Sequence, residues 1–279
     1  MALFRKNDDI DHKQEFVYSR VKKLQSKFDD LIEDVKYDCQ YYSYLFRNLD
    51  ELLNILEDFR NEVLKNYIDR LMNNIHHEYW ADEQFEKFEK LYSRINKFFH
   101  IIQYESSYAT SLSAFENLLN LLPPGCPNLR EDIISRFNQI FYEKVNKLTK
   151  INDIKNLQKI SQEIPPSFSR YKNILNQIIH SHIKQQIKLY QENENIQMLV
   201  QLYETLPEAY KSYQEEIPNI ISEIVSKKIQ KCKKDNHFEE LEKLYNEIPR
   251  NFVDAVQKIG NELLKHKFQK KKQTNTNKK

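Results

Sequence analysis

The sequence predicts an all-α protein, and three observations lead to that prediction: glycine is almost absent, a proline recurs every 42 residues, and apolar residues between the prolines have helical spacing. Only two glycines occur in 279 residues, where average usage of about 7% would give roughly twenty. This excludes glycine-dependent phosphate loops, dinucleotide-binding turns and nucleophile elbows. Apolar residues form 40% of the chain and charged residues 30%, a balance typical of a globular protein without membrane spans.

Four dipeptides of one type define the repeat. They are Leu122-Pro123, Ile164-Pro165, Leu206-Pro207 and Ile248-Pro249. Between them the apolar spacing predicts a long helix, from roughly the fourth to the twenty-eighth residue of each unit, and then a shorter helix of about twelve residues. Asn and Asp in the polar break between the two helices are candidate N-caps. Proline ends each pair because it lacks the N–H group that would continue the helix.

Neither helix of a unit can bury its apolar stripe alone, so consecutive hairpins are expected to stack as an α-solenoid. Ungapped units start at residues 81, 123, 165, 207 and 249 and span 81–268, with the last unit ending after its first helix. A rival frame, 54–95 with a break at Trp80–Glu83, fits equally well, which leaves the start of the repeats between 54 and 81. Residues 269–279 are expected to be a lysine-rich flexible tail.

The first 80 residues follow a different pattern, in which apolar residues alternate steps of four and three, as in a heptad repeat. The pattern continues to Val63 with one polar interruption at Asp38. It predicts a long helix packed along a seam, either in a coiled coil or in a bundle hairpin broken near Asn48–Asp50. An uncovered seam favours a homodimer. The candidate self-association residues are Val17, Val21, Leu24, Phe28, Leu31 and Val35.

Charge is distributed unevenly along the chain. The net charge of +2 combines −6 in residues 1–122 with +8 in residues 123–279, and residues 227–279 hold 15 basic against 7 acidic side chains. These lysines fit a solvated helix face and tail, contact with nucleic-acid phosphates, or contact with anionic lipid headgroups. The candidate polyanion contacts are Lys227, Lys228, Lys231, Lys233, Lys234, Lys270, Lys271 and Lys272.

No catalytic, cofactor-binding or metal-binding residue is predicted. The three cysteines, Cys39, Cys126 and Cys232, have no disulfide or zinc spacing and are expected to be buried. The histidine clusters are His76-His77 and His180-Ser-His182. Neither has the three- or four-residue spacing that places two metal ligands on one helix face. His182 and His266 share a repeat position with isoleucines, so partly buried structural histidines are expected there.

We therefore expect a non-enzymatic scaffold or adaptor that offers an extended helical surface to protein partners. The alternative is the same scaffold attached to an anionic membrane surface or a nucleic acid through residues 227–279, and an enzyme with an unrecognised all-helical site is a third class. No small-molecule substrate is implied. Charged residues interrupt the N-terminus before an apolar stretch of signal-peptide length forms, which predicts a soluble, intracellular protein.

Overall fold

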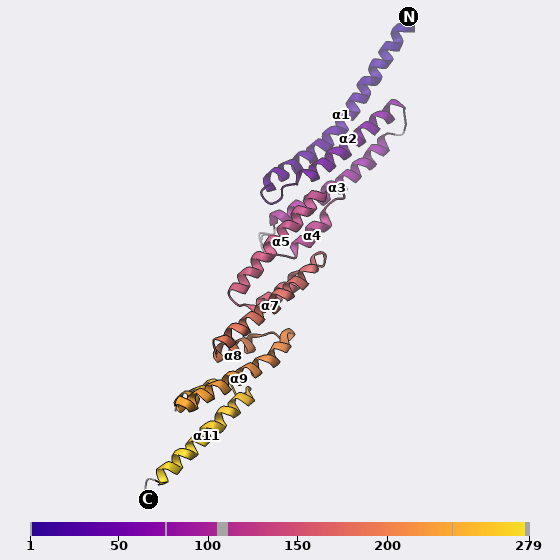
Figure 1. Ribbon diagram of the computed structural model, residues 1–279. Helices are drawn as coiled ribbons and strands as arrows, with labels where there is room; N and C mark the ends of the chain where they lie inside the picture. The colour runs from indigo at the N-terminus through magenta and orange to yellow at the C-terminus, as the bar shows by residue number, and fades with distance from the viewer. Residues whose placement is uncertain (1, 76, 105–110, 236, 277–279) are drawn as a thin grey trace. The chain divides into compact units, whose positions relative to one another are not determined.

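The computed structural model describes residues 2–75, 77–104, 111–235 and 237–276 (Figure 1). Over these ranges the chain is all-helical and contains no strand, which confirms the predicted class. The α-helices are α1 (Ala2–Tyr42), α2 (Asp50–Met72), α3 (Glu78–Tyr104), α4 (Ala114–Leu121), α5 (Pro127–Lys150), α6 (Ile154–Glu163), α7 (Arg170–Glu192), α8 (Ile196–Thr205), α9 (Lys211–Asp235), α10 (Phe238–Glu247) and α11 (Val253–Thr276). None of the described helices is long and apolar enough to cross a bilayer.

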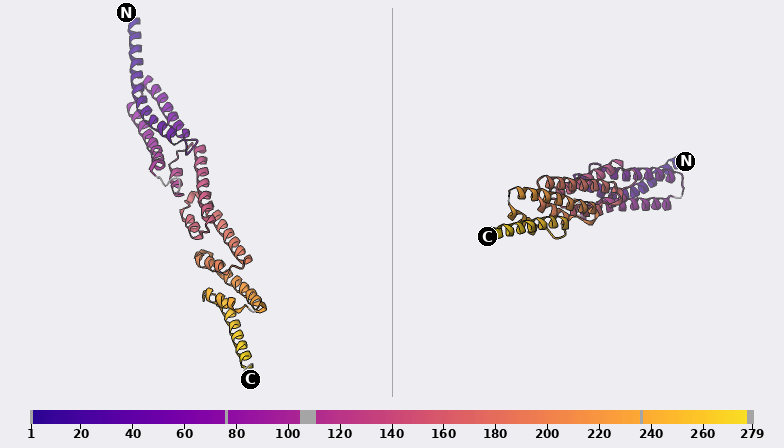
Figure 2. Two further views of the ribbon diagram at one scale, coloured as in Figure 1. Left: turned by 90° about the vertical axis from the view of Figure 1, so that its left-hand side faces the viewer. Right: turned by 60° about the horizontal axis from the view of Figure 1, so that its bottom comes forward.

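The chain divides into two compact units, residues 1–144 with 163–168, and residues 145–162 with 169–279. In the first unit, α1, α2 and α3 lie side by side (Figures 1 and 2). Their core is aromatic: Phe28 of α1 meets Phe88 and Phe85 of α3 edge to face, with ring centroids 4.6 and 5.4 Å apart. Such pairs add stability beyond the apolar area that they bury.

The heptad segment forms a bundle hairpin within one chain. α1 ends at Tyr42 and α2 begins at Asp50, so the chain turns back near the expected position. Of the predicted seam, four residues are buried and two half-buried: Val17, Leu24, Phe28 and Val35, then Val21 and Leu31. Ile32, which the heptad reading omitted, is more buried than Leu31. Because α2 and α3 both contact α1, the chain itself covers the seam that was the reason to expect a dimer.

The turn between α2 and α3 bears on both repeat frames. The rival frame needs a break at residues 80–83, but these residues lie inside α3. The break instead follows Met72, where Asn74 takes a left-handed conformation with φ of 54°. A left-handed residue after the last turn is a common way to end a helix, and Asn tolerates it well. α3 is long, α4 is short and Pro123 follows, in the order expected for the unit 81–122, but α3 begins at Glu78, before that unit starts.

Backbone hydrogen bonds at the later hairpin turns recur with the 42-residue spacing of the sequence. The N–H groups of Asp153, Asn195 and His237 donate to the carbonyls of Leu148, Tyr190 and Cys232, at 3.0, 2.8 and 3.0 Å. Asn152 and Glu194 occupy the left-handed position that this turn requires, with φ of 56° and 50°. Two of the expected N-caps are present, since Asp153 and Asn195 accept hydrogen bonds from the N–H groups of Asn156 and Met198.

The second unit has an aliphatic core. The residues of α7 that are buried after Tyr171 are Leu175, Ile179, Ile183 and Ile187. α9 contacts α7 and α8 before it and α10 and α11 after it. Ser222 forms a polar link between α9 and α11: its hydroxyl donates to the Asp254 carboxylate and accepts from Lys258 Nζ at 2.6 Å. Instead of ending before the predicted tail, α11 continues to Thr276.

Candidate interaction surfaces

The end of α1 presents three tyrosines to solvent. Tyr37, Tyr41 and Tyr44 are 67%, 59% and 74% exposed, and the first two rings stack at 6.2 Å between centroids. Tyr37 and Tyr41 lie one turn apart on α1, and Tyr44 follows the helix end. Tyrosine rings are costly to leave in water and are enriched where proteins bind partners. No described part of the chain covers these rings.

Carboxylates share this face of α1. Asp30, Asp34, Tyr37 and Tyr41 follow steps of four, three and four, which places them on one helical stripe. Asp38 stands beside them, one turn after Asp34. None of the three aspartates makes an ion pair with a described residue. We call Asp30, Asp34, Asp38, Tyr37, Tyr41 and Tyr44 the acidic tyrosine surface.

Asp38 of this surface lies near the C-terminal end of α1, where a carboxylate does not stabilise the helix. The C-terminal end of a helix is the negative end of its dipole and favours cations, yet the last turn of α1 has no basic residue. Partial burial raises the pKa of Asp38, and the nearby Asp34 carboxylate raises it further. The Tyr92 hydroxyl of α3 donates to Asp34 at 3.3 Å. A residue choice that costs helix stability is typical of a site kept for function.

The predicted polyanion lysines divide into two groups. Lys227, Lys231 and Lys234 are exposed along one face of α9 and make no ion pair with a described residue. Lys233 on another face pairs with Glu262 of α11, which also binds Lys265 at 2.9 Å. These two lysines hold the pKa of Glu262 below its usual value.

The other predicted lysines have different surroundings. Lys228 of α9 is half-buried, and Lys270 of α11 is exposed. The side chains of Lys271 and Lys272 lie outside the described part of the structure. Of the eight lysines expected from the sequence, Lys227, Lys231 and Lys234 thus form a stripe on α9 that makes no ion pair with a described residue.

The same helix α11 exposes apolar side chains. Leu264 and Phe268 are 56% and 65% exposed and lie one turn apart on a single face. Lys265 and Lys267 flank them, and Lys267 pairs with Glu242 of α10 at 3.1 Å. This part of α11 is thus both cationic and apolar, which is the chemical opposite of the carboxylates on α1.

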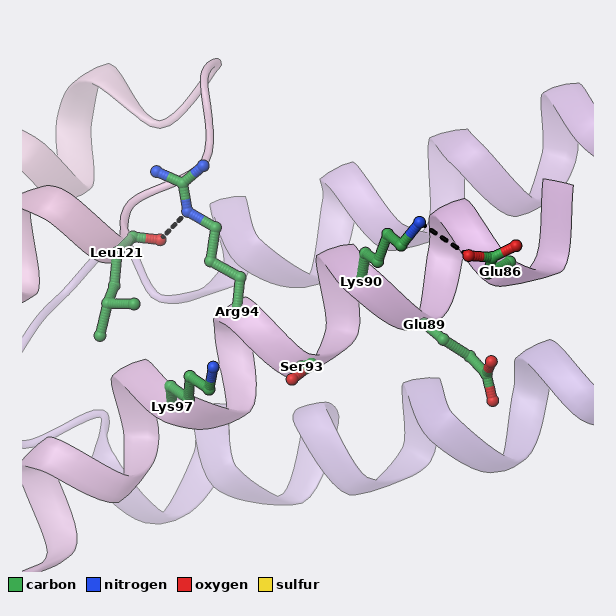
Figure 3. A pocket seen from close by; sticks show the side chains of 7 residues that line it. All are labelled: Glu86, Glu89, Lys90, Ser93, Arg94, Lys97 and Leu121. Carbon is green, nitrogen blue, oxygen red and sulfur yellow. Dashed lines mark hydrogen bonds and ion pairs between the residues drawn. The ribbon is translucent and has the colours of Figure 1, made fainter. Parts of the chain in front are cut away.

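A groove along α3 is lined by charged side chains (Figure 3). The contacts of Arg94 and Lys90 explain why these charges are there. The Arg94 guanidinium donates to the carbonyls of Asn120, Leu121 and Leu122 at 2.8, 2.7 and 2.6 Å. These are carbonyls at the end of α4, which have no partner within the helix. Lys90 pairs with Glu86 at 2.7 Å. The arginine caps a short helix through its Nε and Nη2 groups.

The described histidines do not gather into a metal site. No group of three His, Cys, Asp or Glu residues in the described ranges is placed to bind a metal ion, and His76 lies outside those ranges. His182 is half-buried, and desolvation lowers its pKa. His266 stacks on Phe238 with ring centroids 3.6 Å apart. Both side chains occupy the partly buried positions that the repeat predicts.

The three cysteines are buried, as expected. Burial raises the pKa of the Cys39 thiol to about 12 and that of Cys126 to about 11. Burial also raises the pKa of Cys232, with the neighbouring Glu240 carboxylate adding to the effect. A nucleophilic cysteine needs a lowered pKa, so these thiols have the opposite environment.

Comparison of the chain with protein-family models, with curated proteins and with solved structures finds no match. The class to which this protein belongs is therefore defined by its fold alone: it is an all-helical protein. Its candidate surfaces must be interpreted from their own chemistry.

Sequence reasoning missed the acidic tyrosine surface, although its signal is present in the sequence. Asp30, Asp34, Tyr37 and Tyr41 form a second stripe on α1, opposite the apolar seam. The tyrosines were not separated from core aromatics because a stripe shows which residues share a face, and only the fold shows whether another helix covers that face.

Proposed function

We propose that this chain is a non-enzymatic scaffold or adaptor, an α-solenoid of helical hairpins preceded by a helical bundle, that binds protein partners on exposed helix faces. One observation supports this proposal above all: the acidic tyrosine surface of α1 exposes three aromatic rings beside three carboxylates that make no ion pair with a described residue. Aromatic residues are enriched among the hot spots of protein interfaces. On a surface that binds no partner, exposed aromatic rings contribute no stability.

The chemistry of this surface specifies what it would bind. Unpaired aspartates attract cations, and the faces of tyrosine rings also attract lysine and arginine side chains. The fitting partner is a basic segment with some apolar side chains. The recurring hairpin turns support the solenoid part of the proposal, since identical turns 42 residues apart repeat the same local geometry.

Affinity capture with purified wild-type chain and a Tyr37→Ala/Tyr41→Ala/Tyr44→Ala variant tests the proposal. The wild type should retain a partner in a defined stoichiometry, and the triple variant should lose it. A matched control is Tyr79→Ala/Tyr142→Ala, which removes two other exposed rings and should keep the partner. If the triple variant retains the same partners as the control, the acidic tyrosine surface is not the binding site.

A second candidate function is attachment to a polyanion through residues 227–279, which the unpaired stripe Lys227, Lys231 and Lys234 favours. Binding to phosphates releases counterions, so three contacts should give a salt slope near −3 in a log–log plot, far below the slope for eight. Titration with duplex DNA and with anionic vesicles between about 50 and 200 mM salt measures that slope. The salt-dependent binding should be lost in Lys227→Gln/Lys231→Gln/Lys234→Gln. It should be unchanged in the control Lys22→Gln/Lys23→Gln/Lys36→Gln.

A further inference from the structure

Two surfaces of this chain complement each other in charge, and both expose side chains at the same helical spacing. Residues 29–44, which contain the whole acidic tyrosine surface, include five acidic residues and one lysine. Residues 264–270 of α11 include three lysines and no acidic residue. Each surface also exposes an aromatic or apolar pair one helical turn apart, Tyr37 with Tyr41 and Leu264 with Phe268. Side chains spaced one turn apart on two helices can interleave in a ridge-and-groove contact.

We propose that the acidic tyrosine surface binds α11 of a second copy of this chain, so that copies associate head to tail. This inference rests on the proposed function and names the partner of the same surface. Leu264 and Phe268 would pack against the stacked rings of Tyr37 and Tyr41. The flanking lysines Lys265 and Lys267, which are exposed and pair with Glu262 and Glu242 within the single chain, would lie over the carboxylates and tyrosine faces, where cations are attracted.

The charges favour a contact between unlike surfaces over a two-fold symmetric one. Two copies of α11 facing each other would bring lysines together, and two copies of the acidic tyrosine surface would bring aspartates together, and like charges repel. A contact between different surfaces leaves one of each kind free on every dimer. Association therefore continues to larger assemblies unless the geometry closes a ring.

Salt and concentration give the first test. Sedimentation of the wild type should show species beyond a dimer that grow with protein concentration. Raising the salt from about 50 to 500 mM should weaken association, because exposed charges are then screened over a few ångströms. A wild type that remains monomeric at tens of micromolar in low salt would overturn the proposal.

Two variants give the decisive test. The head variant Tyr37→Lys/Tyr41→Lys places cations where lysines of α11 should bind, and the tail variant Leu264→Glu/Phe268→Glu places carboxylates where they meet aspartates. All four positions are solvent-exposed, so the fold should survive, which circular dichroism checks. Each variant alone should lose association by about a hundredfold or more, the scale of losing two interface hot spots.

A mixture of the two variants should then form a one-to-one dimer and stop there, because the intact head of one variant binds the intact tail of the other. A mixture that remains monomeric, or a single variant that still dimerises with itself, contradicts a head-to-tail contact. The control Tyr79→Lys/Leu189→Glu changes exposed residues outside both surfaces and should associate like the wild type.

The outcome also separates this inference from the proposed function. If the wild type is monomeric but a captured protein depends on Tyr37, Tyr41 and Tyr44, the surface binds a different partner and only the second-copy assignment is wrong. If a monomeric wild type binds duplex DNA and the tail variant does not, α11 serves the polyanion candidate instead. If none of these is found, both proposals fail.

Discussion

The bundle α1–α3 and the hairpins α7–α10 cover their apolar helix faces in different ways. In the bundle, residues far apart in sequence meet: Phe28 of α1 packs on Phe85 and Phe88 of α3. In the hairpins, α7 contacts α8 and α9, and α9 contacts α10 and α11, so each long helix is covered by its near neighbours in the chain. Both regions are helical. They differ in how many residues separate the contacting side chains along the sequence.

This difference predicts different responses of the two regions to deletions and core substitutions. A bundle held by long-range aromatic contacts should loosen as a whole, because each helix covers the other two. Hairpins held by nearest-neighbour contacts should behave as additive modules, with unit and interface terms that sum. Four experiments test this contrast, from the largest expected effect to the smallest.

Deleting a whole unit or half of one tests modularity. Removing residues 165–206 joins equivalent positions of two repeats and should leave a helical chain with a cooperative thermal transition. Removing only residues 165–185 leaves the rest of α7 without most of its apolar stripe and should abolish cooperative folding of the second unit. Circular dichroism during heating measures both. A more stable shorter deletion would show that the 42-residue frame is wrong.

Truncating one core side chain in each region compares how many helices are destabilised by the substitution. Phe28→Ala should destabilise the chain by about 3–5 kcal/mol and Ile183→Ala by about 2–5 kcal/mol, since both side chains are fully buried. Amide hydrogen exchange should rise throughout α1, α2 and α3 in the first variant. In the second it should rise in α7, α8 and α9 only. Equal spreading in both variants would remove the contrast.

Replacing left-handed turn residues compares two similar turns. Glu194 has φ of 50° and carries a side chain that disfavours this conformation, so Glu194→Gly should stabilise by roughly 1 kcal/mol. Asn74 occupies the matching position of the bundle turn at φ of 54°, and Asn tolerates it. Asn74→Gly should change stability by less than half as much. Chemical denaturation gives both values, and a destabilised Glu194→Gly would contradict the account.

The smallest expected effect concerns Asp38. Its pKa is raised in the folded chain, so the folded state binds a proton more readily than the unfolded state. Its contribution to stability is therefore greatest below the unfolded pKa and is lost as the pH rises through the folded value. Asp38→Asn should stabilise the chain at neutral pH by up to about 0.5 kcal/mol and should change little at pH near 3. Destabilisation at neutral pH would mean that the carboxylate makes a favourable contact.

The repeat was readable from the sequence because its signals are local. Proline at 165, 207 and 249 acts on its own backbone, and Asp153 and Asn195 cap helices with bonds that span three residues. The turn at Asn73-Asn74 was not predicted, because the left-handed conformation of Asn74 that marks it is a property of the folded backbone. Leu31 was chosen over Ile32 because a strict heptad does not follow the helical period.

The candidate surfaces were less predictable. The lysines of residues 227–279 were visible as a cluster, but their division depends on Glu262, which pairs with Lys233 from 29 positions away. The tyrosines of α1 could be distinguished from core aromatics only after α2 and α3 were placed. Burial and pairing of this kind are long-range properties, which a helical stripe does not encode.

The buried thiols have a practical consequence. Cys39, Cys126 and Cys232 are inaccessible, and their raised pKa values leave almost no thiolate at neutral pH. A single cysteine introduced on an exposed helix face should react with maleimide or nitroxide reagents far faster than the native three. Pairs of spin or fluorescent labels can thus be placed on this chain without first removing its own cysteines, and distances between them would follow the helices in solution.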